Sequence, residues 1–510
     1  MHPLLLAAGP VLFLFAQNAE QQVTLGPLWR PLIVVLLGAG VTLVACIAAL
    51  RDVQRGALLA GLLVALFMSF GHVWNATGDL LLEPIWLAPF YVGAALAGGF
   101  LAWRGGRWVA GANRFVSVAA AVFVVINLVR VGDFALGSIG PTQETVERAP
   151  ILVNEEAPRP DIYYLILDRY AGPDVLREVY DMDPEPFLGE LEERGFAVAR
   201  DSWANYFKTA LSVASSLEMS YLDPERYDDS DPDSFDRVHA SLRQRLAVPA
   251  TLKALGYEYV HIGNTWEPNA TNVDADIVLR YEEGSEFETA VMATTPLMLA
   301  GPAVLPDDDD AETLPFPELN RKHILFGFDR LEEAASRPGP TFVFAHILVP
   351  HPPYVFDTDG SMPTEAERRE RRETEEYRRQ VAWTNQRTLA ALDRLLSAPG
   401  EGEPVIVLQS DEGPWPPRFS ADQTDFQWLE ATDAEIHWKY SILNALRLPG
   451  VDAREAGFDN SISPVNEFRV VFNALFGSNL PLLPDRYNLS PDYDHMWSLV
   501  EYERPDAPVF

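Results

Sequence analysis

Five apolar runs occupy the first 131 residues, and polar or charged residues separate them. A membrane-spanning helix needs about 20 apolar residues to cross a hydrocarbon core of about 30 Å. The second and fourth runs reach this length, the first and third are short, and the fifth is interrupted. A cleaved signal peptide is the alternative for the first run, but no basic segment precedes it and no clean cleavage site follows it. We therefore expect five spans, over residues 3–16, 31–50, 57–70, 85–103 and 108–129.

The basic residues between these runs predict the orientation of the chain. Lys and Arg accumulate in cytoplasmic loops. Arg51 and Arg55 lie between the second and third runs, and Arg104, Arg107 and Arg114 flank the connection between the fourth and fifth runs. We therefore expect a multi-pass protein of the cytoplasmic membrane, with everything after about residue 132 on the extracytoplasmic side.

The second half of the chain alternates short apolar runs with helical patterns. The runs are continuously apolar, as expected for strands that are covered on both faces. Strands are expected at 161–167, 257–262, 341–348, 405–409 and 440–446, and helices at 185–194, 238–255, 320–335, 365–396 and 465–476. Such alternation predicts an α/β sandwich around a mostly parallel central sheet. The chain then divides into a helical transmembrane domain (1–131), a linker (132–158) and an extracytoplasmic domain (159–510).

Gly and Pro residues recur in the linker, which lacks sustained apolar periodicity. A second loop, residues 301–317, contains four consecutive carboxylates at 307–310. Calcium binding is the alternative interpretation of this run, but the alternating spacing and the glycine of an EF-hand loop are absent. A solvated surface loop is therefore expected.

Charge separates the two halves further. The chain of 510 residues has 39 basic and 73 acidic side chains, but residues 1–150 hold only 8 basic and 7 acidic ones. The strongly acidic second half repels phosphate backbones, so nucleic acid is not an expected partner. The single cysteine, Cys46, excludes an intrachain disulfide and a cysteine-ligated zinc cluster.

Polar side chains follow three of the expected strands. Asp168 follows the first, His351 follows the third, and Asp411 and Glu412 follow the fourth. In parallel sheets ligands bind outside the carboxyl ends of the strands. Each Asp alone is better explained as a turn residue. Together, carboxylates and an imidazole at one sheet edge predict a divalent-metal site.

Thr209 is the expected nucleophile. It stands between a polar stretch and the apolar-periodic segment ALSVASSLEM, so it is expected at or near a helix start. The free N–H groups and the positive end of the helix dipole there suit an alkoxide and the oxyanion that it attacks. A plain threonine N-cap is the alternative.

The order of these residues resembles the sulfatase-like branch of the alkaline phosphatase superfamily. The matching features are Asp168, Thr209 ahead of a helix of small residues, His351, and Ser410-Asp411-x-Gly413. The membrane anchor before an exported domain is similar to the lipoteichoic acid synthase and phosphoglycerol or phosphoethanolamine transferase type. The resemblance covers residues 158–500 and implies an alkaline phosphatase/sulfatase-like fold for this part of the chain.

The resemblance also implies roles for the individual residues. Asp168, Thr209 and Asp411 would bind the metal, and Thr209 would attack and carry the transferred group. His351 would contact the phosphate or assist the leaving group. Glu412 stands where the family usually has the histidine of S-D-H-G. A carboxylate there favours Mn²⁺, Mg²⁺ or Ca²⁺ over Zn²⁺, or it marks a lineage that has lost catalysis.

Asn205, Lys208 and His437 are candidate substrate contacts, with a surface or packing role as the favoured alternative for each, while His346 is expected to be structural. Sulfatases require a Cys or Ser in C/S-x-P-x-R, and the segment around Thr209 does not fit, so sulfate-ester hydrolysis is disfavoured.

The sequence as a whole predicts a membrane-anchored, metal-dependent phosphoester transferase or hydrolase with a threonine nucleophile. The resemblance implies that its substrates and partners are membrane lipids and envelope glycans or lipids. The alternative is a catalytically inactive sulfatase-like membrane protein that binds envelope polymer or a protein partner, and Glu412 is its main support.

Overall fold

A computed structural model describes most of the chain. The described residues are 2–17, 25–77, 84–139, 151–154, 156–222, 238–239, 242, 246–281, 286–297, 317–398, 402–421, 426–492 and 495–505. They form two compact units, one built on the N-terminal helices and one on the second half of the chain. Each unit is described by itself.

Apolar helices make up the first unit. They are α1 (His2–Gln17), α2 (Gly26–Leu50), α3 (Val53–Thr77), α4 (Ala88–Arg104) and α5 (Trp108–Ile139), with a short 3-10 helix, η3 (Pro84–Leu87), before α4. Four helical segments among the described residues are long and apolar enough to cross a membrane: α2, α3, residues Ile85–Arg104 of η3 and α4, and Trp108–Asp133 of α5. Helix α1 has 16 residues and is shorter. The third span, which seemed short in the sequence, is a 25-residue helix because polar residues such as Gln54 and Arg55 on one side and Asn75 on the other continue the helix beyond its apolar core. The last helix continues to Ile139, into the segment expected as linker.

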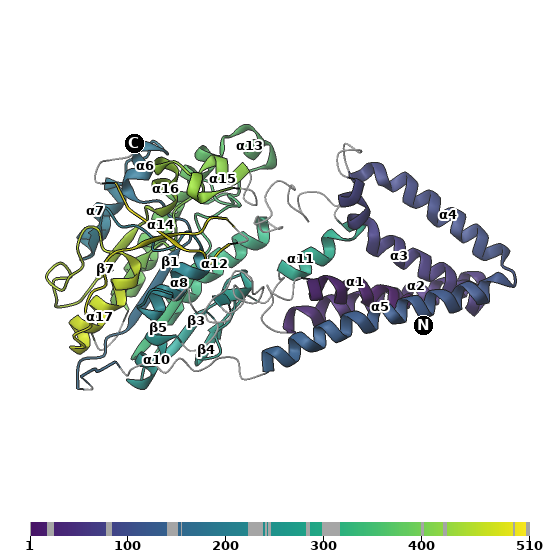
Figure 1. Cartoon of the computed structure of the whole chain (residues 1–510), viewed down its shortest axis with the longest axis horizontal. Coiled ribbons are helices and arrows are strands. Elements are labelled where there is room, and N and C mark those ends of the chain that lie inside the picture. The colour runs from purple at the N-terminus through teal and green to yellow at the C-terminus, as the bar shows by residue number, and fades with distance from the viewer. Residues whose placement is uncertain are drawn as a thin grey trace. The chain divides into compact units, whose positions relative to one another are not determined.

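One segment from the second half of the chain belongs to the first unit. Helix α11 (Glu286–Ala293) packs beside α1 and α2, as Figure 1 shows. The ring of Phe287 meets Phe15 edge to face at 5.3 Å, and Glu288 lies 3.7 Å from Arg30. The backbone N–H of Gly71 donates to the carbonyl of Thr294, an approach that leaves no room for a side chain at position 71. The helical pattern of the first 131 residues gives no sign of this contact.

The second unit is built on a seven-stranded sheet. Its strands are β1 (Ile162–Leu167), β2 (Ala197–Ala199), β3 (Glu258–Ile262), β4 (Ile277–Leu279), β5 (Thr341–Ile347), β6 (Val405–Gln409) and β7 (Asn444–Arg447), in the order β2-β7-β6-β1-β5-β3-β4. The five strands from β6 to β4 are parallel, and β7 and β2 extend the sheet antiparallel at one edge. The predicted fold class, apolar helices followed by an α/β domain with a mostly parallel sheet, is confirmed.

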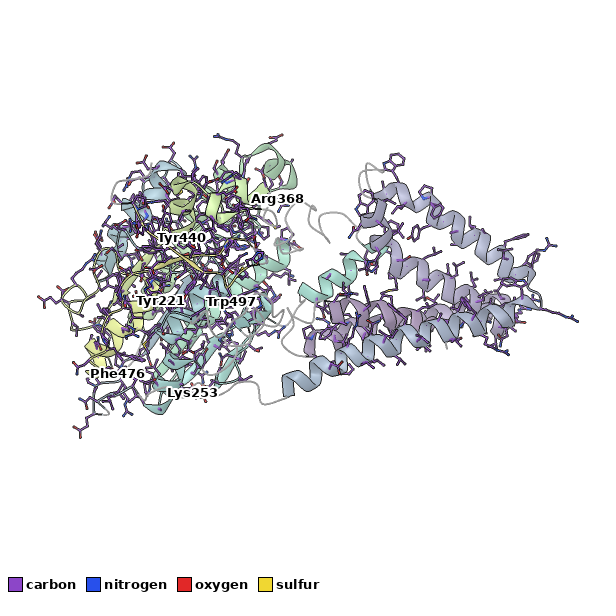
Figure 2. All side chains as sticks on the ribbon, viewed as in Figure 1. Tyr221, Lys253, Arg368, Tyr440, Phe476 and Trp497 are labelled. Carbon is purple, nitrogen blue, oxygen red and sulfur yellow. The ribbon has the colours of Figure 1, made fainter. Side chains whose placement is uncertain are left out.

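Helices cover both faces of the sheet (Figure 1). One face packs on α8 (Thr209–Glu218), α10 (Ala247–Ala254) and α17 (Glu467–Phe476). The other packs on α6 (Pro173–Glu178), α7 (Glu185–Glu193), α12 (Pro317–Ala334) and α14 (Glu373–Ser397). Figure 2 labels Tyr440 and Phe476, two fully buried side chains in the core between the sheet and the face that α8, α10 and α17 cover. Continuous burial along β1, β5 and β6 explains their mainly apolar sequences.

Two expected elements differ from the structure. The helix expected at 365–396 is broken into α13 (Glu365–Glu370) and α14, because Arg371 is extended and its guanidinium binds Asp357 and Glu376. The strand expected from residue 440 starts at Asn444. Its expected first residue ends helix α16 (Asp433–Tyr440), which a capping box between Thr432 and Glu435 begins.

The remaining elements are short. They are α15 (Pro417–Ala421), the 3-10 helices η5 (Glu267–Asn269), η7 (Trp428–Glu430) and η8 (Pro464–Asn466), and a two-stranded ribbon of β8 (Tyr487–Leu489) and β9 (Val500–Tyr502). The acidic loop expected at 301–317 lies outside the described residues apart from Pro317.

A buried carboxyl at the start of α17 makes stability depend on pH. Glu467 is fully buried, and burial raises its pKa to about 8, although the amide of Asn444 lowers it. The folded state therefore holds a proton that the unfolded state releases near pH 4.5, so this group costs stability increasingly as pH rises from about 4.5 to about 8. We expect Glu467→Gln to melt with the wild type near pH 4.5 and to be more stable at pH 8, by on the order of a few kcal/mol. Melting curves across this pH range measure the difference, and a difference that does not change with pH would contradict the assignment.

Candidate active site

Three side chains from adjacent parallel strands meet at the carboxyl edge of the sheet. They are Asp168 after β1, His346 near the end of β5, and Asp411 after β6, and one ligand atom from each lies within 4.8 Å of the others. Nε2 of His346 is 2.8 Å from Oδ2 of Asp168. All three are almost completely buried. The sequence predicted the two carboxylates here, but His346 was expected to be structural.

The register of the sheet places these groups together. Ile166 of β1 lies beside His346 of β5 and Gln409 of β6. Because side chains alternate between faces, Asp168 and Asp411, two residues further on, share the face of His346. Helix α8 packs on that same face through its apolar side.

The turn after β1 is held by the turn after β6. Arg169 has a φ of 58°, a left-handed conformation that is uncommon outside glycine, and its backbone N–H donates to Oδ1 of Asp411 at 3.1 Å. The next N–H, of Tyr170, donates to the hydroxyl of Ser410 at 2.8 Å. These bonds fix the spacing of the two carboxylates through the backbone.

Thr209 is the first residue of α8, as the sequence predicted. Its side chain lies close enough to Asp411 to lower the pKa of that carboxyl, so the hydroxyl stands beside the acidic group at the positive end of a helix. The neighbouring N-cap residue, Lys208, is in an extended conformation and is largely buried.

The buried carboxylates at this site favour the binding of a cation. Burial, together with the charges of Asp168 and Glu412, raises the pKa of Asp411 to about 7. Burial opposes ionisation of Asp168 as well, but the charges of His351 and His346 lower its pKa to about 2. Oδ1 of Asp168, Oδ2 of Asp411 and Oε2 of Glu412 are buried and have no hydrogen-bond partner among the residues that the structure describes. Buried carboxylate oxygens without donors are costly unless a cation binds them, so the residues present fit a divalent metal ion.

Glu412 forms ion pairs with two basic side chains. Its Oε1 lies 2.9 Å from Nε of Arg169 and 2.8 Å from Nζ of Lys439. The guanidinium of Arg169 also lies over the ring of Trp415, at 3.4 Å from the ring centre. Burial lowers the pKa of Lys439 to about 8, although Glu412 raises it. One oxygen of Glu412 is thus shared by two cations, and its role as a metal ligand stays a prediction.

His351 and Lys208 lie close to this centre. The charge of His351 acts on Asp168, and its ring meets Trp415 edge to face at 5.9 Å. Lys208 and Lys439 both lie 5.9 Å from the ring centre of Phe419. Basic groups therefore line the side of the centre that Trp415 and Phe419 form.

Asn205 and His437, the other candidate substrate contacts, have structural partners. The amide of Asn205 donates to the carbonyl of Arg486 at 3.0 Å and accepts from the N–H of Val465. His437 binds the carboxylate of Asp174 through Nε2 and stands edge-on to Trp203. Neither side chain belongs to the group of metal-ligating residues, and contact of either with substrate stays a prediction.

Gly413 is required by a close backbone approach. A Cβ at this position would lie 2.5 Å from the carbonyl oxygen of Trp438 and 2.7 Å from that of Lys439, whose carbonyl accepts the Gly413 N–H. We expect Gly413→Ala to destabilise the domain by about 1–3 kcal/mol and to move the turn that carries Asp411. Thermal melting measures the first effect and metal content the second. Gly189→Ala, with open space around the added methyl, is the matched control, and equal melting of both variants would contradict the argument.

The comparisons with known proteins are structural. No protein-family model and no curated protein matches the chain. The zinc complex of the C-terminal periplasmic domain of EptC from Escherichia coli has 12% sequence identity and a TM-score of 0.42, over 69% of this chain and 96% of that one. Lipooligosaccharide phosphoethanolamine transferase A from Neisseria meningitidis, an integral membrane protein, has 13% identity and a TM-score of 0.40, over 92% of this chain and 94% of that one.

A protein of the alkaline phosphatase superfamily from Vibrio parahaemolyticus has 11% identity and a TM-score of 0.42, over 69% of this chain and 79% of that one. These similar structures are of the type that the sequence motifs indicated. At TM-scores below 0.5 they carry no argument about chemistry, so the function is argued from the side chains of the site.

Proposed function

We propose that this chain is a membrane-anchored, metal-dependent enzyme that transfers or hydrolyses phosphate esters, with Thr209 as its nucleophile. The observation that carries the proposal is the convergence of Asp168, His346 and Asp411 next to the hydroxyl of Thr209 at a helix start. An alcohol needs a positive centre or a base beside it to become nucleophilic, and this position supplies both.

The residues have distinct roles in the proposed reaction. Asp168, His346 and Asp411 would hold a divalent cation, which when bound neutralises phosphoryl oxygens and favours the threonine alkoxide. Thr209 gives its proton to the carboxylate of Asp411, and its Oγ forms a bond to phosphorus while the bond to the leaving alcohol breaks. Protonated His351 gives a proton to that alcohol as it leaves. A second alcohol, or water, then displaces Thr209 from phosphorus and gives its own proton to His351, while Asp411 returns the first proton to Thr209.

The basic side chains beside the centre suit a phosphate substrate. The three cations Arg169, Lys439 and Lys208 balance the three carboxylates of Glu412, Asp168 and Asp411, so a bound divalent cation would leave the site with net positive charge. A phosphodiester, which carries one negative charge, is attracted to such a site. The ligand set of two carboxylates and one imidazole suits Mn²⁺ or Zn²⁺. The sequence favoured Mn²⁺, Mg²⁺ or Ca²⁺ because it counted Glu412 as the fourth ligand.

The topology supplies the proposed location. Arg51 and Arg55 lie at the junction of α2 and α3, and Arg104 and Arg107 lie between α4 and α5. If both junctions are cytoplasmic, α5 exports the second unit whether or not the short helix α1 spans the bilayer. The proposed substrates are therefore membrane lipids, with an envelope glycan or lipid as acceptor, and anchorage keeps the site near both.

Metal removal tests the proposal against the inactive alternative. We expect the purified full-length protein to hydrolyse bis(p-nitrophenyl) phosphate with Mn²⁺ or Zn²⁺ present. We expect EDTA to abolish the activity and added metal to restore it. A protein that holds no divalent ion and remains inert with every metal would favour the catalytically silent alternative.

A further inference from the structure

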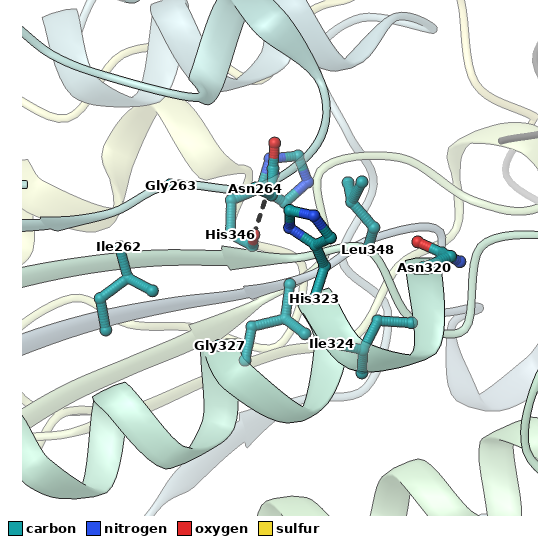
Figure 3. A pocket seen from close by; sticks show the side chains of 10 residues that line it. Ile262, Gly263, Asn264, Asn320, His323, Ile324, Gly327, His346 and Leu348 are labelled. Carbon is teal, nitrogen blue, oxygen red and sulfur yellow. Dashed lines mark hydrogen bonds between the residues drawn. The ribbon is translucent and has the colours of Figure 1, made fainter. Parts of the chain in front are cut away.

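A loop after β5, residues 350–356, carries His351. Figure 3 shows His346 near the end of this strand and Leu348 just beyond it, from where the chain continues into the loop. The amide of Asn264 donates to the carbonyl of His346 at 3.0 Å, so the end of β5 is fixed next to the metal-binding group. The contacts of the loop beyond this point determine where His351 lies.

The loop has few backbone donors of its own. Its sequence is PHPPYVF, and proline has no N–H group, so three of its seven residues cannot donate from the backbone. Buried carbonyl and N–H groups nevertheless require hydrogen-bond partners. In this loop, side chains of a neighbouring helix supply partners that regular backbone pairing does not.

Gln380 is the main source of these bonds. It is completely buried on α14. Its amide nitrogen donates to the carbonyl of Pro350 at 3.2 Å and to that of His351 at 3.1 Å. Its amide oxygen accepts from the N–H groups of Val355 at 2.7 Å and Phe356 at 3.1 Å. One neutral amide thus joins both ends of the loop and binds the backbone of His351 directly.

Helix α14 is itself fixed in place. The hydroxyl of Tyr377 donates to the carbonyl of Arg169 at 2.8 Å and accepts from the N–H of Ala171 at 2.9 Å. The ring of Trp383 stacks on that of Phe356, with 3.5 Å between the ring centres and 3° between the planes. The buried face of α14 therefore contacts both the turn after β1 and the loop after β5.

The imidazole of His351 depends on the same loop. Its Nδ1 contacts the carbonyl oxygen of Pro352, which can only accept, so Nδ1 carries a proton. The proton that the ring passes to a leaving alcohol is therefore the one on Nε2. The charge of His351 acts on Asp168, and its ring meets Trp415 edge to face. Displacement of a catalytic group by about 1 Å can slow a reaction roughly 100-fold, so the position of this loop matters for proton transfer.

We propose that Gln380 is a positioning residue, which holds His351 where it can protonate the leaving alcohol. The inference rests on the proposed function, because Gln380 acts only through the proton transfer that His351 performs there. It acts through the loop backbone and not by contact with the substrate. Loss of its amide should therefore slow the reaction only as far as the leaving alcohol needs a proton.

Two substrates that differ only in the leaving alcohol test this role. p-Nitrophenolate is a weak base and leaves without a proton, whereas phenolate is a stronger base and its departure is assisted by one. With the full-length protein and Mn²⁺, we expect Gln380→Met to lower kcat/KM for methyl phenyl phosphate roughly 10- to 100-fold. For methyl p-nitrophenyl phosphate we expect a change of less than about threefold. The parameter kcat/KM includes only the steps up to departure of the first alcohol, so the second displacement does not contribute.

Further variants locate the effect at His351. Gln380→Glu keeps the oxygen that accepts from the two N–H groups but loses the donor to the two carbonyls, so it should show the same selective loss. His351→Ala should show it as well, and Gln380→Met should add nothing in a His351→Ala background. Gln386→Leu is the matched control, because it removes an exposed amide of the same helix that donates to the carbonyl of Thr358 at 3.3 Å. It should leave both rates unchanged.

The ratio of the two rates does not depend on how much of a variant is folded. An equal loss on both substrates would show that Gln380 only stabilises the fold, and unchanged rates would show that the loop does not need its amide. Either result overturns the inference, and so does a further selective loss in the double variant. If Gln380→Met does not fold, Gln380→Glu decides. A wild type that is inert on both substrates would instead refute the proposed function, and the inference with it.

Discussion

Replacing Thr209 with alanine is expected to lower kcat on bis(p-nitrophenyl) phosphate by roughly 10⁴-fold or more. The hydroxyl belongs to the first residue of α8 and stands beside Asp411, so its loss removes the group that we assign to attack phosphorus next to Asp168, His346 and Asp411. The melting temperature should change little, because Thr209 is half-buried and α8 is held by apolar contacts further along. Initial rates at saturating metal measure the effect.

Two matched variants separate a nucleophile from a helix cap. Thr209→Ser keeps a hydroxyl and should keep activity within roughly 100-fold of the wild type. Ser220→Ala, at an exposed position just past the end of the same helix, should leave kcat unchanged. If Thr209→Ala retains most of the wild-type rate, the hydroxyl caps the helix and does not attack phosphorus.

Replacing His346 with alanine is the second change with a large expected effect. The imidazole is fully buried, with Nε2 at 2.8 Å from Asp168, and no other described histidine belongs to the metal-binding group. We expect the affinity for Mn²⁺ or Zn²⁺ to fall at least about 100-fold, with activity lost at limiting metal and partly recovered at high metal concentration. Competition with a fluorescent chelator measures the affinity. His495→Ala is the control, because the ring of His495 is more than half exposed. An unchanged metal affinity in His346→Ala would show that His346 has the structural role that the sequence suggested.

The fold was largely predictable because its signals are local. Four of the five continuous apolar runs of the second half form parallel strands, and the fifth contains the antiparallel strand β7. The long apolar runs of the first half form the apolar helices of membrane-spanning length. The contact of α11 with α1 and α2 was not predictable, because the sequence of this eight-residue helix does not indicate which other helices it packs against. The break between α13 and α14 depends on the ion pairs of Arg371 with Asp357 and Glu376, which form only in the tertiary structure.

The site was predictable where chain position determines it. Asp168 and Asp411 directly follow buried strands, and Thr209 begins a helix, so each could be placed from its neighbours. His346 was missed because it lies inside a strand, where a histidine usually packs. The available signal was that His346 pairs with Ile166, so His346 and Asp168 lie on the same face of the sheet. This signal can be used only once β1 and β5 are known to be neighbouring strands. The ion pairs of Glu412 join residues far apart in sequence, and no local pattern predicts them.

The position of the bound cation tests the central claim most directly. Anomalous diffraction from crystals grown with Mn²⁺ locates the ion independently of any assay. We predict one ion at about 2.0–2.6 Å from oxygens of Asp168 and Asp411, from a ring nitrogen of His346 and from Oγ of Thr209. An ion bound elsewhere, or these side chains ordered without one at saturating Mn²⁺, would contradict the account.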